Sequence, residues 1–244
     1  MSAENRKCFL TSSPIISGSI ELNPANGFIS ELRRCLKPQI RMLFICANPD
    51  IPEKTDRFAE NVKTAFEEAD FSFADMVVLD GRNSTKARNL IQTADFIVLA
   101  GGHVPTQNRF FEDIGLRQLI SDFDGVLMGI SAGSMNSADT VYAQPEMEGE
   151  ALDPEYHRFL KGLALTETML LPHLQMIRAD VLDGLRVFED IAFPDSMGKK
   201  FYAIPDGSYL FVHDCVEELR GEAHLIQDGK MTQVSAEGEV LILG

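Results

Sequence analysis

The stretch GVLMGISAGSMNSA at residues 125–138 constrains the fold more than any other part of the chain. Its apolar run at 126–130 is bounded by glycines and predicts a buried strand of a parallel sheet. Gly129–Gly133 then fits the pattern G-x-S-x-G, and a helix is expected to begin right after it, at Ser134. A nucleophile elbow requires this strand–turn–helix context, because a serine on so tight a turn needs small neighbours. Ser131 is therefore a candidate nucleophile, and the alternative is a plain glycine-flanked turn.

Apolar runs and helical stripes alternate before this stretch. We expect strands at 8–10, 40–46, 71–79 and 96–99, and helices at 26–36, 55–69, 84–93 and 107–120. Such alternation predicts βαβ units and a mostly parallel sheet, with ligands at the carboxyl ends of the strands.

The pattern changes after residue 139. We expect a long polar loop at 140–156, a short apolar stretch at 168–171 and a helix at 177–188. An antiparallel region should follow from Phe201 onward, with strands at 209–212, 223–227, 231–234 and 240–243. The 244 residues contain no Pro/Ser-rich linker, repeat or low-complexity tract, so we expect one α/β domain over 1–244.

Charge and cysteine usage narrow the class of protein. A net charge of −15 argues against nucleic acid and against an anionic membrane surface as partners. The chain has no C-x-x-C pair, no apolar leader and no run of about 18 apolar residues. We expect free thiols in a reducing compartment, and therefore a cytoplasmic protein, from its four cysteines, Cys8, Cys35, Cys46 and Cys215.

A serine nucleophile needs a base, and a histidine is the usual one. His173 stands out among the five histidines, because it follows an apolar stretch and Pro172, where a strand end would present it beside Ser131. His103 follows Gly101-Gly102 and could face the same crevice or cap the next helix. The remaining histidines are read as surface or edge positions: His157, His213 and His224.

The base in turn needs an orienting carboxylate, and a developing oxyanion needs N–H donors. The loop between Ser131 and His173 offers three glutamates, most of which should be solvated: Glu146, Glu148 and Glu150. The N–H of Ala132 is one oxyanion donor by the elbow geometry, and Gly101 or Gly102 could give another unless they form a bare turn. No metal or cofactor is expected, because the sequence has no H-E-x-x-H, no paired Cys/His ligands and no Walker A motif.

These motifs together resemble the peptidase E family of serine exopeptidases, which includes aspartyl dipeptidases and has cyanophycinases as relatives. The resemblance rests on LAGGH at 99–103, GISAGSMNSA at 129–138, the Pro145-Glu146 loop and LLPH at 170–173. It covers most of the chain, from the first strand to about Val212. It implies a three-layer α/β/α sandwich similar to class I glutamine amidotransferases, in which a cysteine stands where this chain has Ser131.

The resemblance also implies roles for individual residues. Ser131 would be the nucleophile and His173 the base, with the oxyanion held at Gly101-Gly102. An ungapped match places the acidic member at Glu146, 15 residues after Ser131 (146 − 131), and a small shift would choose Glu148 or Glu150. Aspartyl dipeptidases of this family carry an arginine a few residues before that acid, where this chain reads VYAQ at 141–144. This departure leaves selectivity for an N-terminal aspartate open.

The sequence thus predicts a serine exopeptidase or dipeptidase that acts on short peptides through Ser131, His173 and Glu146. We expect no nucleic-acid or membrane partner and allow for a homodimer. One alternative is an esterase of the α/β-hydrolase class, whose base would come from His213 or His224. The other is a catalytically silent binding protein of the same fold.

Overall fold

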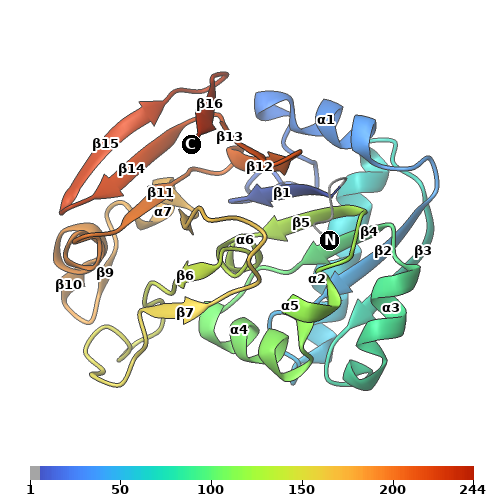
Figure 1. Cartoon of the computed structure of the whole chain (residues 1–244), viewed down its shortest axis with the longest axis horizontal. Coiled ribbons are helices and arrows are strands. Elements are labelled where there is room, and N and C mark those ends of the chain that lie inside the picture. The colour runs from blue at the N-terminus through green and yellow to red at the C-terminus, as the bar shows by residue number, and fades with distance from the viewer. Residues whose placement is uncertain (1–5) are drawn as a thin grey trace.

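The computed structural model describes residues 6–244. Its largest sheet has eight strands in the order β16-β13-β12-β1-β5-β4-β2-β3 (Figure 1). The five strands from β1 to β3 in this order run parallel, and β12, β13 and β16 add an antiparallel edge. Their bounds are Lys7–Thr11 (β1), Ile40–Ile45 (β2), Phe73–Leu79 (β3), Phe96–Leu99 (β4), Val126–Ile130 (β5), Tyr209–His213 (β12), Val216–Arg220 (β13) and Val240–Leu243 (β16).

Helices cover both faces of this sheet because its central strands are apolar on both sides. In β2, Met42 and Phe44 pack into one buried cluster, and Leu43 and Ile45 into another. The first cluster includes residues of α1 and α2, and the second includes residues of α3, α4 and α5. These helices span Phe28–Cys35 (α1), Pro52–Glu68 (α2), Ala87–Thr93 (α3), Val104–Asp113 (α4) and Leu116–Leu119 (α5). The predicted three-layer α/β/α sandwich with a mostly parallel sheet is confirmed.

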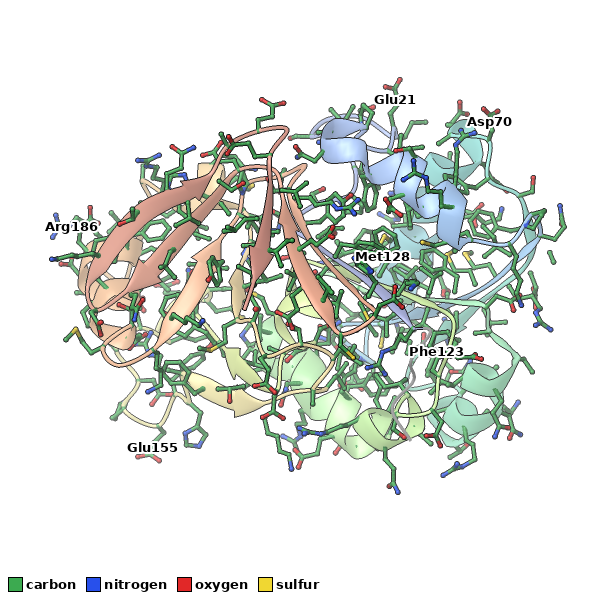
Figure 2. All side chains as sticks on the ribbon, turned by 45° about the horizontal axis from the view of Figure 1, so that its top comes forward. Glu21, Asp70, Phe123, Met128, Glu155 and Arg186 are labelled. Carbon is green, nitrogen blue, oxygen red and sulfur yellow. The ribbon has the colours of Figure 1, made fainter. Side chains whose placement is uncertain are left out.

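The side chains follow the same layering. Figure 2 shows Met128 of β5 in the interior, whereas the labelled Glu21, Asp70, Glu155 and Arg186 lie at the periphery. Burying apolar surface on both faces of the sheet supplies the main driving force for this arrangement.

A second sheet lies beside the first, with the strand order β15-β14-β11-β8 (Figure 1). Its strands span Leu170–Leu171 (β8), Lys200–Ala203 (β11), Ala223–Gln227 (β14) and Lys230–Ser235 (β15). β8 and β11 are parallel, and the other pairs are antiparallel. A two-stranded ladder of β6 (Thr140–Tyr142) and β7 (Phe159–Lys161) packs on it through Tyr142, which stacks on Phe201 at 4.4 Å between ring centroids.

The helix expected at 177–188 is wrong. A short helix α7 (Leu174–Ile177) is followed by a hairpin of β9 (Val181–Leu182) and β10 (Leu185–Arg186), and then by a π-helical turn η3 (Val187–Ala192) and α8 (Phe193–Asp195). The hairpin turn is Asp183-Gly184, with φ of 54° and 82°. Two consecutive residues at positive φ favour a tight hairpin over a continuous helix.

Smaller differences concern element boundaries. The helix expected at 107–120 is two helices, α4 and α5, because Gly115 takes a left-handed conformation with φ 65°. Single 3₁₀ turns, η1 (Ala25–Gly27) and η2 (Ser84–Lys86), precede α1 and α3. The strand β13 was not predicted. Within residues 6–244, the structure contains no helix with the length and apolar character that a membrane crossing demands.

Candidate active site

Ser131 occupies a strained turn between β5 and α6 (Ala132–Met135). Its φ is 50° and its ψ is −110°, a conformation that a residue with a Cβ adopts only when its surroundings enforce it. The flanking glycines permit the close packing: a Cβ on Gly129 would lie 2.7 Å from the backbone N of Ser134, and one on Gly133 would lie 2.3 Å from the carbonyl oxygen of Leu99. The expected need for small neighbours at this turn is confirmed.

The carboxyl ends of two parallel strand pairs converge on this turn. In the large sheet, Ser12 follows β1 and Ser131 follows β5, and the last residues of these strands, Thr11 and Ile130, are paired in register. In the small sheet, His173 and Asp206 follow the ends of the parallel strands β8 and β11. Four polar side chains from four separate segments therefore meet at one place, as expected where parallel strands end.

A hydrogen-bond chain links three of these side chains. The hydroxyl of Ser131 donates to Nε2 of His173 across 2.8 Å, and Nδ1–H of His173 donates to Oδ1 of Asp206, also across 2.8 Å. Partial burial opposes ionisation of Asp206, but hydrogen bonds from His173 and Ser12 outweigh it and lower the pKa of this carboxyl. Asp206 is thus a stable carboxylate at the far nitrogen of the imidazole, the arrangement that makes a serine hydroxyl nucleophilic.

Ser12 connects all three members of this chain. Its hydroxyl donates to Asp206 Oδ1 at 2.6 Å and accepts the backbone N–H of His173 at 2.8 Å. Its carbonyl oxygen accepts the backbone N–H of Ser131 at 3.1 Å. Ser12 was not among the residues singled out from the sequence.

The expectation that Glu146 orients His173 is wrong, because Asp206 holds that position. Glu148 is exposed, and Glu150 contacts a different histidine. Asp206 lies 33 residues beyond His173 and therefore outside the loop between Ser131 and His173 that carries the three glutamates. A sequence signal existed: Ile204-Pro205-Asp206-Gly207 is a turn that follows an apolar stretch, with an acidic side chain where a strand ends.

Glu150 connects the loop at 146–150, called here the acidic loop, to the segment after β4. One carboxylate oxygen bonds Nε2 of His103 at 2.8 Å, and the other accepts the backbone N–H groups of Glu146 and Met147 at 2.9 and 3.0 Å. The other ring nitrogen of His103 bonds the Thr106 hydroxyl at 2.8 Å. His103 therefore tethers this loop beside Gly101-Gly102.

Glu146 lies close enough to His173 for their charges to interact, without bonding to it. Its side chain retains solvent access, yet the surrounding protein limits its solvation and raises its pKa to about 7. The carboxylate of Glu150 adds to this increase, and His173 opposes it. Glu146 and Glu150 thus form an acidic pair beside the Ser131–His173–Asp206 chain.

Two predicted oxyanion donors lie against Ser131. A Cβ on Gly101 would lie 3.5 Å from Cβ of Ser131, so the backbone of Gly101 borders the candidate nucleophile. Ala132 is the first residue of α6, and its N–H has no partner inside the helix. Gly102 lines a cavity of about 310 Å³ together with Gly101, Ser131 and His173.

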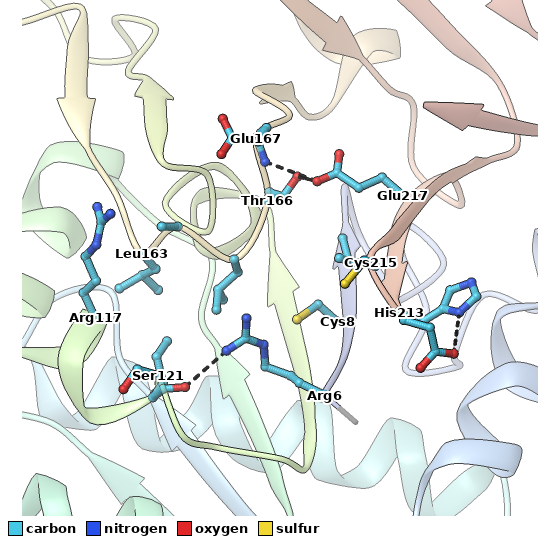
Figure 3. Close-up of a pocket in the computed structure, with 15 residues that line it drawn as sticks. Arg6, Cys8, Arg117, Ser121, Leu163, Thr166, Glu167, His213, Cys215 and Glu217 are labelled. Carbon is cyan, nitrogen blue, oxygen red and sulfur yellow. Dashed lines mark hydrogen bonds and ion pairs between the residues drawn. The ribbon is translucent and has the colours of Figure 1, made fainter. Parts of the chain in front are cut away.

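The histidines that an α/β-hydrolase would use are not at this site. His213 lines a separate cavity of about 490 Å³ together with Arg6 and Cys8, where its ring bonds Asp214 (Figure 3). Arg6 and Cys8 are at the start of β1, so this cavity lies at the opposite end of the sheet from Ser131. His224 bonds Glu222 at 2.8 Å. The esterase alternative of that class therefore has no base beside Ser131.

No cluster of three or more His, Cys, Asp or Glu side chains is arranged to hold a metal ion among residues 6–244.

Comparisons with known proteins identify the family and the fold of this chain. The sequence model of peptidase family S51 matches residues 8–219. A crystal structure of a peptidase from an acI-B1 Actinobacterium has a TM-score of 0.67 and 17% identity, with 100% of this chain and 99% of that chain covered. A Listeria monocytogenes EGD-e protein whose description assigns it to peptidase E has a TM-score of 0.53 and 18% identity, with 94% and 98% covered. At these identities the two structures establish likeness of fold alone. None of the curated proteins compared with the sequence matches it.

Proposed function

Because the chain belongs to peptidase family S51, a family of serine peptidases, we propose that it is an exopeptidase that cleaves short peptides through Ser131, His173 and Asp206. The observation that carries this proposal is the hydrogen-bond chain from Ser131 through His173 to Asp206 at a strained turn. Each group stands within 2.8 Å of the next, which is the reach that proton transfer requires.

The first half of the reaction makes an acyl-enzyme. Oγ of Ser131 attacks the peptide carbonyl as Nε2 of His173 removes its proton, and Asp206 stabilises the resulting imidazolium. The negative charge that develops on the carbonyl oxygen is met by backbone N–H groups of Ala132 and Gly101 or Gly102. The carbon–nitrogen bond then breaks, and His173 returns the proton to the leaving amine.

The second half releases the acyl group. Water attacks the ester carbonyl, His173 takes its proton, and the ester bond to Oγ breaks as His173 protonates Ser131 again. No other group is needed to balance protons or electrons.

The acidic pair supports the exopeptidase assignment. Glu146 and Glu150 bring carboxylates near His173, where they would attract the α-ammonium group of a short peptide. An internal peptide bond has no such charge nearby, so this field favours substrates with a free amino terminus. The four free cysteines support a reducing compartment such as the cytoplasm.

A dipeptide library tested on the wild type and on Ser131→Ala is the direct experiment. We expect hydrolysis by the wild type and a loss of at least about 10³-fold in the variant. A fluorophosphonate probe should label Ser131 in the wild type only. The proposal fails if Ser131→Ala retains a tenth of the wild-type activity, or if peptides with a blocked amino terminus are cleaved as well as free ones.

A further inference from the structure

The cavity beside the nucleophile has a wall that the reaction itself does not use. Besides Gly101, Gly102, Ser131 and His173, the cavity of about 310 Å³ is lined by Ser13, Pro14, Ile15, Phe58 and Ile130. The apolar side chains come from three segments: the loop after β1, helix α2 and the end of β5. Its volume is near the lower end of the range for ligand sites, roughly 300–1,000 Å³, and suits one side chain better than a long ligand.

This wall carries no formal charge. Among the described residues that line the cavity, none is a lysine, arginine, aspartate or glutamate, and His173 is already bonded on both ring nitrogens. A charged substrate side chain that entered would lose its hydration without gaining a partner. The carboxylate of Asp206, which is bonded to His173, and the carboxylates of Glu146 and Glu150 would also repel an acidic side chain.

Resting on the exopeptidase function proposed above, we propose that this cavity is the specificity pocket for an uncharged apolar side chain on the residue whose carbonyl Ser131 attacks. We place this side chain in the acyl half because the cavity is bordered by Ser131, which attacks the carbonyl in the proposed mechanism, and by Gly101, a proposed oxyanion donor. The favoured substrates are therefore short peptides that begin with leucine, methionine or phenylalanine rather than aspartate.

A series of dipeptides tests the preference for the acyl residue and for the leaving residue separately. The dipeptides Leu-Gly, Phe-Gly, Asp-Gly and Lys-Gly vary the acyl residue, and Gly-Leu and Gly-Asp vary the leaving residue. We expect kcat/KM for Leu-Gly or Phe-Gly to exceed that for Asp-Gly and Lys-Gly by at least about tenfold. A preference for Asp-Gly, or a preference that follows the leaving residue instead, would overturn the assignment.

Substitution at Ile15 tests the wall itself. Ile15→Arg places a guanidinium in the cavity, so relative activity on Asp-Gly should rise and activity on Leu-Gly should fall, reducing their ratio at least about tenfold. Ile16→Arg is the matched control. The side chain of Ile16, next to Ile15 in the sequence, is 36% exposed and does not line the cavity. If Ile15→Arg does not fold, Ile15→Ala, which enlarges the cavity, should shift preference from leucine toward phenylalanine. Unchanged selectivity in the folded Ile15 variant contradicts the proposal.

Binding can be measured without turnover of an amide. The boronic acid analogues of leucine and aspartate form a tetrahedral adduct with a serine hydroxyl, so their inhibition constants for fluorophosphonate labelling of Ser131 report the pocket directly. The leucine analogue should bind at least about tenfold more tightly. If the protein cleaves aspartyl peptides best, only the pocket assignment fails. If no peptide is cleaved and neither analogue binds, the exopeptidase function fails with it.

Discussion

The hydroxyl of Ser12 donates a hydrogen bond to Oδ1 of Asp206 across 2.6 Å, the same oxygen that accepts Nδ1–H of His173. The same hydroxyl accepts the backbone N–H of His173. Ser12 is fully buried at the end of β1, so it joins the large sheet to the two segments of the small sheet that carry His173 and Asp206, the proposed base and acid. The relative position of the two sheets is therefore coupled to the geometry of the reaction.

Removing this hydroxyl should impair catalysis more than binding. In Ser12→Ala, Asp206 loses one donor and the N–H of His173 loses its acceptor, so the imidazole is held less firmly. We expect kcat to fall by about 10–100-fold with little change in KM, since small displacements of reacting groups have effects of this size. Steady-state kinetics on one dipeptide measures both parameters.

Ser137→Ala is the control for a general loss of stability. The hydroxyl of Ser137 is also buried and donates to the carbonyl of Gly133 at 2.7 Å, but it touches no member of the triad. Both variants should lose about 1–3 kcal/mol in free energy of unfolding, because each leaves a buried polar group without its partner. If Ser137→Ala lowers kcat as much as Ser12→Ala does, Ser12 acts only through stability.

The strain at Ser131 predicts a difference between two inactive variants. Both Ser131→Ala and Ser131→Gly remove the nucleophile, but only glycine adopts φ 50° and ψ −110° without a Cβ clash. We expect the glycine variant to be more stable than the alanine variant by about 1 kcal/mol, or ~2–4 °C in Tm for a chain of this size. Equal or reversed Tm values in thermal unfolding would mean that the turn stores no such strain.

Local patterns in the sequence singled out Ser131 and His173, whereas for Asp206 they marked only an acidic residue at a turn and did not indicate its partner. The elbow is encoded within one strand, one turn and one helix, and its glycines are visible as letters. The proximity of Asp206 to His173 instead depends on the parallel pairing of β8 with β11, two strands of two and four residues. Strands this short leave little periodic signal, so neither their pairing nor its register could be predicted.

The same distinction, between patterns within one element and pairing between elements, explains which parts of the fold could be predicted. The parallel strands and the helices between them were predictable because apolar periodicity extends over whole elements. The error at 177–188 arose because apolar residues at helical spacing also suit a short hairpin, and the turn at Asp183-Gly184 decided between them.

Two carboxylate substitutions separate the roles of Asp206 and Glu146. Asp206→Asn removes the charge that fixes the imidazole tautomer and stabilises the imidazolium, so kcat should fall by about 10²–10⁴-fold. Glu146→Gln should leave kcat within a few-fold and raise KM for peptides with a free amino terminus. If the two effects are exchanged, Glu146 is the functional acid despite the position of Asp206 in the structure.

The contacts of Glu150 predict that Glu150→Ala behaves differently from both Asp206→Asn and Glu146→Gln. Glu150→Ala removes the acceptor of two backbone N–H groups and the partner of His103, so the acidic loop should move away from its place beside His173. KM should increase, as for Glu146→Gln, and amide hydrogen exchange should become faster at Glu146 and Met147. His103→Ala, which removes only the partner at the other oxygen, should have the smaller effect. Unchanged exchange in Glu150→Ala would show that the loop is held by other contacts.

Glu146 also predicts a pH dependence whose sign can be worked out. Its pKa is raised from 4.5 to about 7 in the folded protein, so between these values the folded state keeps a proton that the unfolded state has lost. The free energy of unfolding of the wild type should therefore fall relative to that of Glu146→Gln as pH rises from 4.5 to 7, and the difference should stay constant above that range. As pH rises through about 7, Glu146 becomes ionised and attracts an α-ammonium group, whose own pKa is about 7.7–8.0. KM of the wild type should thus decrease as pH rises toward 7.5, while KM of Glu146→Gln should not. If KM has the same pH profile in the two proteins, Glu146 takes no part in substrate binding, whatever the unfolding data show.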